Sequence, residues 1–301
     1  MPPIDPVSLA DAAVIGGSYA GLSSALQLAR ARRRVVVIDA GQRRNRFASA
    51  SHGFLGQDGR SPGEIVADAR AQLLAYPNVE WRDATATQAT ATAEGFRVSF
   101  TDGAALSTRK LVLATGVIDG LPPIEGVAAR WGQHVFHCPY CHGYELDGGH
   151  IGVLAVGPVS LHHALMLPDW GTVTFFTNEA ITLSESDRAA LDARGVTLEP
   201  ARVVAIEDAA TVVLADGRRV PLAGLFVAPR THVASPIAEA LGCAFDEGPM
   251  GPYLRVDAMQ QTSVPGVFAC GDAARAAGNV ALAVGDGAMA GAATHRALMF
   301  G

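Results

Sequence analysis

The residues most able to do chemistry in this sequence are two cysteines separated by two positions. Cys138 and Cys141 stand in the segment His-Cys-Pro-Tyr-Cys-His, and His142 follows the second cysteine directly. Such a pair can close into a small disulfide ring, and neighbouring charges or dipoles can lower the pKa of its thiols into a reactive range. Because histidine exchanges protons near neutral pH, His142 is a candidate general acid or base. We therefore take Cys138, Cys141 and His142 as candidate catalytic residues of a thiol–disulfide exchange.

Three other interpretations of this segment stay open from the residues alone. Cys-x-x-Cys-His is also the attachment pattern of c-type haem, which requires export, and residues 1–12 contain neither a basic region nor a long apolar one. Zinc could be held by the two cysteines together with His134, His137 and His142, although ligands this close along the chain do not easily converge on one ion. The two cysteines could also be inert and buried. We expect no metal site.

A glycine-rich turn near the N-terminus carries the pattern of a nucleotide-binding fingerprint. Gly16-x-Ser18-x-x-Gly21 follows an apolar run and opens a helical pattern, which is the context that a dinucleotide-binding turn requires. Ser18 replaces the usual central glycine, and Asp39 ends the next apolar run, where a carboxylate accepts hydrogen bonds from ribose hydroxyls. The predicted elements are a strand at 12–15, a helix at 22–30 and a strand at 35–38.

A second unit of the same kind begins near residue 151. Its turn reads Ala155-x-Gly157-x-x-Ser160, so only the central glycine of the fingerprint is present. The 2′-phosphate of NADPH needs cationic partners. After the second strand, however, the chain has Glu179 and no arginine until Arg188. Binding of NAD(P)H is therefore doubtful, and NADH is favoured over NADPH if either binds. The predicted elements are a strand at 151–156, a helix at 160–167 and a strand at 171–176.

The composition bounds the class of protein. The chain has 301 residues, 49% of them hydrophobic, which suffices for large cores and fits two domains. A net charge of −6 and only 6% aromatic residues argue against a nucleic-acid-binding surface. No apolar run is long enough for a transmembrane helix, and we expect a cytoplasmic protein. The remaining cysteines, Cys243 and Cys270, stand alone and are expected to be buried.

Two further motifs resemble those of flavoproteins. The segment from Thr262 to Asp272, which reads TSVPGVFACGD, resembles the second flavin motif of the pyridine-nucleotide–disulfide oxidoreductases. Ala114-Thr115-Gly116 resembles the motif that ends the first FAD segment of the same family. This resemblance implies FAD as the cofactor. The candidate cofactor-binding residues are Gly16, Ser18, Gly21, Asp39, His52, Ala114, Thr115, Gly116, Gly271, Asp272, Asn279, Val280 and Ala281.

The flavin motifs, the cysteine pair and the chain length together resemble the low-molecular-weight thioredoxin reductases over nearly the whole chain. That resemblance implies that Cys141 faces the flavin, that Cys138 exchanges with the substrate, and that the protein is a homodimer. In those reductases an acidic residue usually follows the second cysteine, where this chain has His142. The stretch from Cys138 to Glu145, together with Ser51-His-Gly-Phe-Leu55, is more similar to the dithiol oxidases of gliotoxin- and holomycin-type metabolites. Those enzymes imply oxygen as the electron acceptor and a histidine base, with His52 as a supporting candidate.

The expected fold is α/β, with two Rossmann-like nucleotide-binding domains. An FAD-binding domain is expected in two segments, 1–117 and 231–301, and a central NAD(P)-binding-like domain with the cysteine pair at 118–230. Our leading hypothesis is an FAD-dependent oxidoreductase that oxidises a small dithiol with oxygen. The alternatives are an NAD(P)H-dependent reductase that acts on a small disulfide or a thioredoxin-like protein, and a non-catalytic FAD-binding redox sensor. We expect neither nucleic acid nor a membrane as a partner.

Overall fold

The computed structural model describes residues 9–301, which divide into two compact units. Unit 1 comprises residues 9–44 together with Gly63–Ile118 and Thr231–Gly301, and unit 2 comprises Asn45–Pro62 and Asp119–Arg230. This division differs from the expected one chiefly at residues 45–62, which pack with unit 2 rather than with the first segment of the chain. Most of the segment examined for an export signal, residues 1–8, lies outside the described residues.

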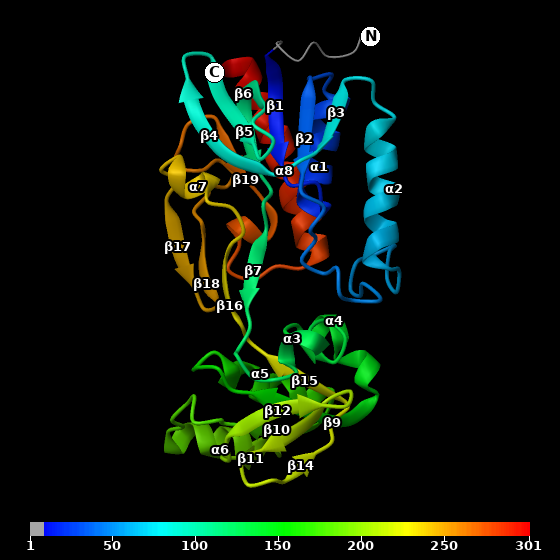
Figure 1. The fold of residues 1–301 in the computed structure, drawn as a ribbon, viewed down its shortest axis with the longest axis vertical. Coiled ribbons are helices and arrows are strands. Elements are labelled where there is room, and N and C mark those ends of the chain that lie inside the picture. The colour runs from blue at the N-terminus through cyan, green and yellow to red at the C-terminus, as the bar shows by residue number, and fades with distance from the viewer. Residues whose placement is uncertain (1–8) are drawn as a thin grey trace. The chain divides into compact units, whose positions relative to one another are not determined.

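Unit 1 is built on a sheet with the strand order β3-β2-β1-β6-β5-β4, and β19 pairs with β6 (Figure 1). Strands β1, β2, β3, β6 and β19 run parallel, whereas β4 and β5 form an antiparallel extension from β6. The strands are β1 (Ala10–Ile15), β2 (Val35–Asp39), β3 (Val79–Asp83), β4 (Ala86–Thr92), β5 (Gly95–Phe100), β6 (Ala105–Leu113) and β19 (Val267–Ala269).

The central strands of unit 1 are buried on both faces, as their continuous apolar runs predict. In β1, Ala12 and Val14 face one core, and Ala13 and Ile15 face the other. The first core is covered by α1, α2 and α8, and the second by the β4–β5 hairpin and α7. The remaining elements are α1 (Tyr19–Arg30), α2 (Pro62–Leu74), α7 (Ile237–Ala240), β17 (Phe245–Gly248), β18 (Gly251–Leu254), η3 (Gly271–Ala274) and α8 (Val280–Phe300).

Unit 2 repeats the strand–turn–helix pattern on a smaller parallel sheet, with the order β11-β10-β9-β15-β8. An antiparallel sheet of β12, β13 and β14 packs beside it through a shared apolar core. The strands are β8 (Val135–Phe136), β9 (Gly148–Leu154), β10 (Gly171–Phe176), β11 (Thr197–Glu199), β12 (Val203–Glu207), β13 (Thr211–Leu214), β14 (Arg219–Val220) and β15 (Gly224–Val227). The helices are α3 (Val127–Arg130), α4 (Pro139–His142), η1 (Tyr144–Leu146), α5 (Ser160–Met166), η2 (Leu167–Asp169) and α6 (Glu185–Ala193).

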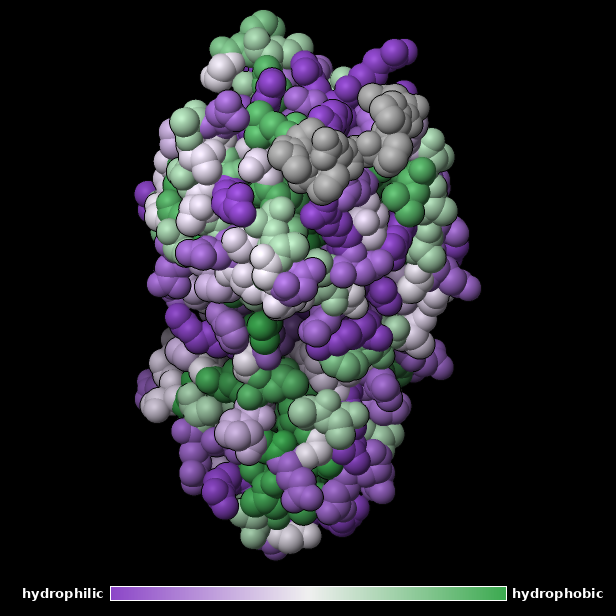
Figure 2. Space-filling model, turned by 45° about the horizontal axis from the view of Figure 1, so that its top comes forward, coloured by the Kyte–Doolittle hydropathy of each residue, from purple (hydrophilic) through white to green (hydrophobic). Residues whose placement is uncertain are grey.

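The chain passes between the units along β7 (Val117–Gly120) and β16 (Arg230–Val233), which pair with each other. Among the residues that the structure describes, no helix combines the length and apolarity needed to cross a membrane. Hydrophilic and hydrophobic residues are interspersed over the face drawn in Figure 2. The α/β class and the two Rossmann-like units confirm the fold expected from the sequence.

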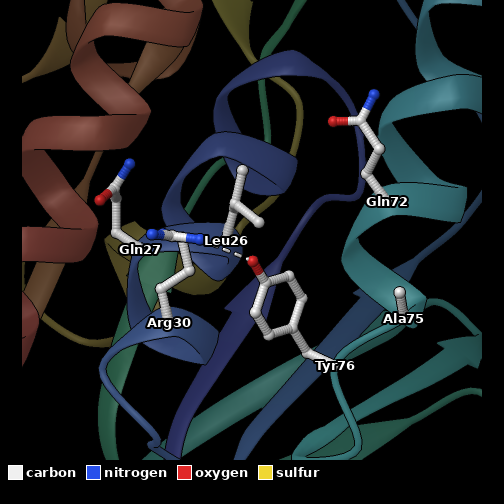
Figure 3. A pocket seen from close by; sticks show the side chains of 6 residues that line it. All are labelled: Leu26, Gln27, Arg30, Gln72, Ala75 and Tyr76. Carbon is white, nitrogen blue, oxygen red and sulfur yellow. Dashed lines mark hydrogen bonds between the residues drawn. The ribbon is translucent and has the colours of Figure 1, made fainter.

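A surface hollow in unit 1 lies where the last turns of α1 and α2 meet (Figure 3). The Arg30 guanidinium crosses this hollow and donates a hydrogen bond to the Tyr76 hydroxyl over 2.9 Å. The hollow contains no candidate cofactor-binding or catalytic residue. Its lining residues are Leu26, Gln27, Arg30, Gln72, Ala75 and Tyr76.

Helices α1 and α8 pack so closely that a side chain would not fit at Gly287 or Gly291 of α8. A Cβ on Gly287 would lie 2.1 Å from the carbonyl oxygen of Ala20, and one on Gly291 would lie 2.4 Å from that of Ser24. By contrast, a Cβ on Gly285, in the same helix, would meet no atom within 4 Å. The contact with α1 therefore requires glycine at two positions of α8 but not at the third.

We predict that Gly287→Ala lowers the free energy of unfolding by about 1–3 kcal/mol, because α8 must move away from α1. The matched control, Gly285→Ala, should raise that free energy by up to about 1 kcal/mol, because alanine loses less conformational entropy in a helix. Urea unfolding followed by circular dichroism measures both changes. Equal stability of the two variants would contradict the packing argument.

Candidate active site

The turn between β1 and α1 brings two segments of backbone into direct contact. Gly16 has a φ of +107°, and a Cβ there would lie 2.2 Å from the carbonyl oxygen of Ala114. A Cβ on Gly21 would lie 1.8 Å from the carbonyl oxygen of Gly16, so the first turn of α1 requires glycine. Ser18 occupies the N-cap position of α1, and its side chain makes no capping hydrogen bond. The turn thus has the compact backbone that a dinucleotide phosphate approaches in Rossmann folds.

Asp39 is tied to this turn by a hydrogen bond. The Gly17 amide donates to Asp39 Oδ1 over 3.0 Å, so the carboxylate at the end of β2 is held beside the turn. A side chain on Gly17 would collide with Asp39 and with the Trp81 ring. Trp81 is in turn covered by the Arg70 guanidinium, which lies 4.1 Å from the ring centroid. The position of Asp39 is therefore fixed by its neighbours.

The two flavin-type motifs lie at the same edge of the sheet as this turn. Ala114, Thr115 and Gly116 follow β6 directly, and Gly271 and Asp272 form the start of η3 after β19. Because β1, β2, β6 and β19 are parallel neighbours, their carboxyl ends share one edge, which is where such sheets bind ligands. The structure thus brings together candidates that are separated by more than two hundred residues in the sequence.

Asp272 and the start of α8 carry the remaining candidates of unit 1. Arg44 Nη1 donates a hydrogen bond to Asp272 Oδ2 over 2.9 Å, which fixes the carboxylate. Asn279 caps α8, because its Oδ1 accepts a hydrogen bond from the Leu282 amide over 2.8 Å. Val280 and Ala281 are the first residues of that helix.

One buried atom of unit 1 supports the fit of a cofactor at this edge. The Thr115 hydroxyl oxygen is inaccessible and has no hydrogen-bond partner among the described residues. A buried hydroxyl without a partner costs about 1–3 kcal/mol, so such atoms usually mark a missing ligand or water. Together with the backbone turn and the fixed Asp39 carboxylate, the residues present fit the adenosine and phosphate parts of a dinucleotide.

Unit 2 holds the cysteine pair. Cys138 and Cys141 form a disulfide, with their Cα atoms 5.3 Å apart across α4. Cys138 is the N-cap residue of α4, and the Cys141 amide donates to its carbonyl oxygen. The Tyr140 ring between them is exposed and meets the Trp170 ring edge to face, at a centroid distance of 5.5 Å. The pair therefore exists as the small ring that its spacing predicts, beside an exposed aromatic side chain.

His142 is held against the core of unit 2. Its ring stacks on Phe136, with centroids 4.3 Å apart and an interplanar angle of 17°. Burial lowers the pKa of His142 to about 4, although the Glu145 carboxylate raises it and His52 lowers it further. His142 is therefore neutral throughout the physiological pH range, with one ring nitrogen unprotonated.

The structure places His52 in unit 2 with the cysteine segment. His52 Nε2 lies 3.5 Å from Glu145 Oε1, and its Nδ1 lies 3.6 Å from Asp58 Oδ1. Asp58 also accepts a hydrogen bond from the Gly53 amide over 2.8 Å, which closes the loop around His52. His52 therefore lies in unit 2 beside Glu145, near His142, whereas the other candidate cofactor-binding residues lie in unit 1.

In the turn of unit 2, two amides donate to acceptors within the turn itself and a third position is a proline. The Val156 amide donates to Ser160 Oγ over 3.0 Å, the Ser160 amide donates to the Gly157 carbonyl, and Pro158 has no amide hydrogen. After β10, Asn178 Oδ1 accepts a hydrogen bond from the Val203 amide over 2.8 Å. Several groups that could bind a nucleotide are thus engaged within the protein itself.

The two remaining cysteines are buried in unit 1. Burial raises the pKa of the Cys270 thiol far above its usual value, and the nearby Asp286 carboxylate raises it further. Burial also raises the pKa of Cys243, although a hydrogen bond with Thr262 partly opposes this. Among the described residues, no three His, Cys, Asp or Glu side chains are grouped as metal ligands.

Sequence reasoning missed three residues that shape these sites. The Gly17 amide binds the Asp39 carboxylate. The sequence feature that could have identified Gly17 is its place as the second residue of the Gly16-Gly17 pair after β1. The Glu145 carboxylate acts on His142. The sequence feature that could have identified Glu145 is its position three residues after His142. Phe136 carries no such signal, because one phenylalanine in a short apolar strand resembles any other core residue.

We predict that Asp39→Ala weakens FAD binding by about 10- to 100-fold, since it removes a ribose acceptor and leaves the Gly17 amide without its partner. Asp102→Ala is the matched control, because Asp102 also accepts a backbone hydrogen bond, from Ala104, in an exposed turn of unit 1. The ratio of flavin to protein after dilution and filtration measures the effect. Equal flavin retention in the two variants would remove Asp39 from the site.

Comparisons with known proteins agree with this arrangement. Residues 10–287 match the family described as pyridine nucleotide-disulphide oxidoreductase. The chain is 35% identical over 298 residues to thioredoxin reductase tcpT of Claviceps purpurea, covering 94% of this chain and 92% of that protein.

Two solved structures are similar over nearly the whole chain. The oxidoreductase from Agrobacterium tumefaciens has 56% identity and a TM-score of 0.95, covering 97% of this chain and 99% of its own. HlmI has 37% identity and a TM-score of 0.89, covering 97% of this chain and 93% of its own. The resemblance to thioredoxin reductases is confirmed, and the family implies FAD binding. The chain belongs to the pyridine nucleotide-disulphide oxidoreductase family, as a thioredoxin reductase-like oxidoreductase with its cysteine pair at Cys138 and Cys141.

Proposed function

We propose that this oxidoreductase oxidises a small dithiol through the Cys138–Cys141 pair and uses oxygen as the final electron acceptor. The observation that carries the proposal is the turn of unit 2, whose Val156 and Ser160 amides are paired internally and whose Pro158 has no amide hydrogen. A pyrophosphate is bound chiefly by free amides at such a turn. A unit with few of them is poorly suited to a nicotinamide cofactor, so electrons are expected to come from the thiol substrate.

The proposed exchange begins with proton removal by His142. A substrate thiol gives its proton to the neutral imidazole, and the resulting thiolate attacks Cys138 Sγ. The Cys138–Cys141 bond breaks, and Cys141 Sγ leaves with the electron pair. The second substrate thiol then attacks the mixed disulfide at the substrate sulfur. The substrate leaves as a cyclic disulfide, and Cys138 and Cys141 remain as two thiols.

The cofactor edge of unit 1 completes the proposed reaction. When bound at this edge, FAD would supply a two-electron acceptor for the reduced cysteine pair, and oxygen would be the final acceptor, with hydrogen peroxide as its product. Gly16, Ser18, Gly21 and Asp39 would bind its adenosine and phosphate parts, and Asp272 its ribityl chain. The other candidates at this edge, which would line the flavin, are Ala114, Thr115, Gly116, Gly271, Asn279, Val280 and Ala281.

The surroundings of the disulfide favour a small substrate with an apolar or aromatic part. The Tyr140 side chain is 74% exposed and the Tyr144 side chain 85% exposed, and each lies within a few residues of the cysteines. Exposed tyrosines offer broad apolar contact with a polar tip and lose little conformational entropy on binding. His52 lies beside Glu145, and both side chains act on the pKa of His142.

An NAD(P)H-dependent reductase remains the second candidate, and one observation favours it. Gly157 leaves open space at the turn of unit 2, since a Cβ there would meet no atom within 4 Å. Glu179 is exposed after β10, where it would repel a 2′-phosphate. This alternative therefore predicts NADH rather than NADPH. A non-catalytic redox sensor would bind FAD but show no turnover.

We predict that dithiothreitol alone bleaches the flavin absorbance of the anaerobic holoenzyme and that air restores it. Cys138→Ser and Cys141→Ser should each abolish turnover, because neither can form the exchanging disulfide, whereas Cys243→Ser, a buried cysteine of unit 1, should not. Rapid bleaching by stoichiometric NADH or NADPH would instead assign the protein to the reductases. Normal turnover of both active-site variants would sink the dithiol mechanism.

The protein is also proposed to be a homodimer, and the exposed side of α8 supports this. Leu282 and Met289 lie two turns apart on α8, 40% and 43% exposed, and Phe300 at its end is 78% exposed. Large apolar side chains gathered on one side of a helix usually mark a protein interface.

We predict that Met289→Glu shifts the protein from dimer to monomer, because it places a charge in the proposed interface. Leu55→Glu is the matched control, since Leu55 is 97% exposed in unit 2. Sedimentation velocity measures both masses. The interface is misplaced if the two variants sediment alike.

A further inference from the structure

We propose that Phe136 is the positioning residue of His142: its buried ring seats the imidazole and directs proton exchange to one ring nitrogen, Nε2. The inference rests on the proposed dithiol exchange, in which His142 takes the substrate proton. Phe136 is a core residue of unit 2, and it would act through its contact with His142 rather than on the disulfide itself.

The contact between the two rings is a face-to-face stack. Their centroids are 4.3 Å apart and their planes differ by 17°. Phe136 is only 6% exposed, so water cannot reach the covered face of the imidazole. An imidazole packed flat on a buried ring keeps its plane, and rotation about its side-chain bonds would break the stack.

Phe136 is itself fixed by the sheet of unit 2. It lies in β8 opposite Phe226 of β15, and the two ring centroids are 5.7 Å apart. Phe226 is fully buried, and His163 of α5 meets its ring edge to face at 6.3 Å. The rings of His142, Phe136, Phe226 and His163 therefore form a continuous series from the disulfide to α5. Phe136 cannot turn away without disturbing this series.

The packing of His142 on Phe136 also determines which ring nitrogen can exchange a proton with the substrate. Its Nδ1 is buried and has no hydrogen-bond partner among the described residues. Nε2 is thus the atom left to meet a substrate thiol. For Nε2 to accept a proton, the neutral ring must carry its hydrogen on Nδ1, where this N–H finds no acceptor among the described residues. Burial disfavours the charged form that results when Nε2 takes a proton, and it lowers the pKa of His142.

Charged groups around His142 do not explain its neutrality by themselves. Glu145 from η1 favours the charged form, and His52 from the 51–60 loop opposes it, with Asp58 beside His52. The cysteines of α4 carry no charge while they form the disulfide. Burial is the largest cause of the lowered pKa, and Phe136 supplies the buried surface in contact with the ring.

The test compares Phe136→Leu with Phe175→Leu in the oxidised holoenzyme. Phe175 is fully buried in the same core of unit 2 and has no recorded ring contact with His142, so it controls for loss of a core phenyl ring. Nuclear magnetic resonance of labelled histidine rings gives the pKa of His142, with His142→Gln identifying its signal. We expect Phe136→Leu to raise this pKa by at least about one unit from about 4, and Phe175→Leu to leave it unchanged.

The pH dependence of kcat/KM provides the second readout. The acidic limb due to His142 should move to higher pH in Phe136→Leu by the same amount as the pKa. An unchanged pKa in Phe136→Leu, or equal shifts in both variants, overturns the inference. Should Phe136→Leu not fold, Phe136→Met takes its place. A wild-type His142 that titrates near 6.5 overturns the inference without any variant.

The two proposals fail in different ways. The ring measurement uses the oxidised protein without substrate or oxygen consumption, so it does not depend on the dithiol reaction. If His142 behaves as expected but Cys138→Ser retains turnover, the seat exists and the proposed function is wrong. If Cys138→Ser is inactive but Phe136→Leu leaves the pKa of His142 unchanged, the dithiol exchange is supported and the positioning role of Phe136 is wrong.

Discussion

The close approach of Gly16 and Gly21 is the constraint on which unit 1 depends. A Cβ on Gly21 would lie 1.8 Å from the Gly16 carbonyl oxygen, so any side chain there would push α1 away from β1. Because α1 is held so near the sheet, α8 can in turn pack on α1 through Gly287. The amide of Gly17 then reaches Asp39, and Ala114 closes the other side of the turn. The cofactor edge is therefore a result of backbone contacts before any polar side chain is considered.

Unit 2 shows that the same topology can carry different chemistry. Its turn also follows a buried strand of a parallel sheet, yet here the Ser160 hydroxyl accepts a hydrogen bond from the Val156 amide of the turn. The sheet edge at β8 instead supports the cysteine pair and the stacked ring of His142. A Rossmann-like fold thus describes only the arrangement of strands and helices. Whether such a fold binds a nucleotide depends on the side chains at its turns.

Much of the fold could be predicted from the sequence because its signals are local. The continuous apolar run at 12–15 forms strand β1, and the segment at 171–176, which is rich in β-branched and aromatic residues, forms strand β10. Asp102-Gly103 and Asp216-Gly217 have the composition of hairpin turns, and they lie between β5 and β6 and between β13 and β14. The cysteine pair was recognisable from spacing alone, and its disulfide is present.

What could not be predicted depends on contacts between distant segments. Nothing in residues 45–62 indicates that they pack with unit 2, and this packing brings His52 to Glu145. The stack of His142 on Phe136 likewise depends on the exact position of a two-residue strand. Sequence periodicity identifies which residues are buried, but it does not say which buried ring lies beneath a functional one.

The burial of Cys243 and Cys270 has a consequence for the oxidase reaction proposed above, whose product would be hydrogen peroxide. Peroxide attacks thiolates far faster than thiols, and both of these side chains are kept protonated and covered. Of the four cysteines in the sequence, only the pair at 138 and 141 is placed to become reactive. Oxidation of cysteine thiols by the product of the proposed reaction would thereby be limited to the two cysteines that turnover returns to a disulfide. The packing of Cys243 and Cys270 in the core would therefore protect these two thiols from the product.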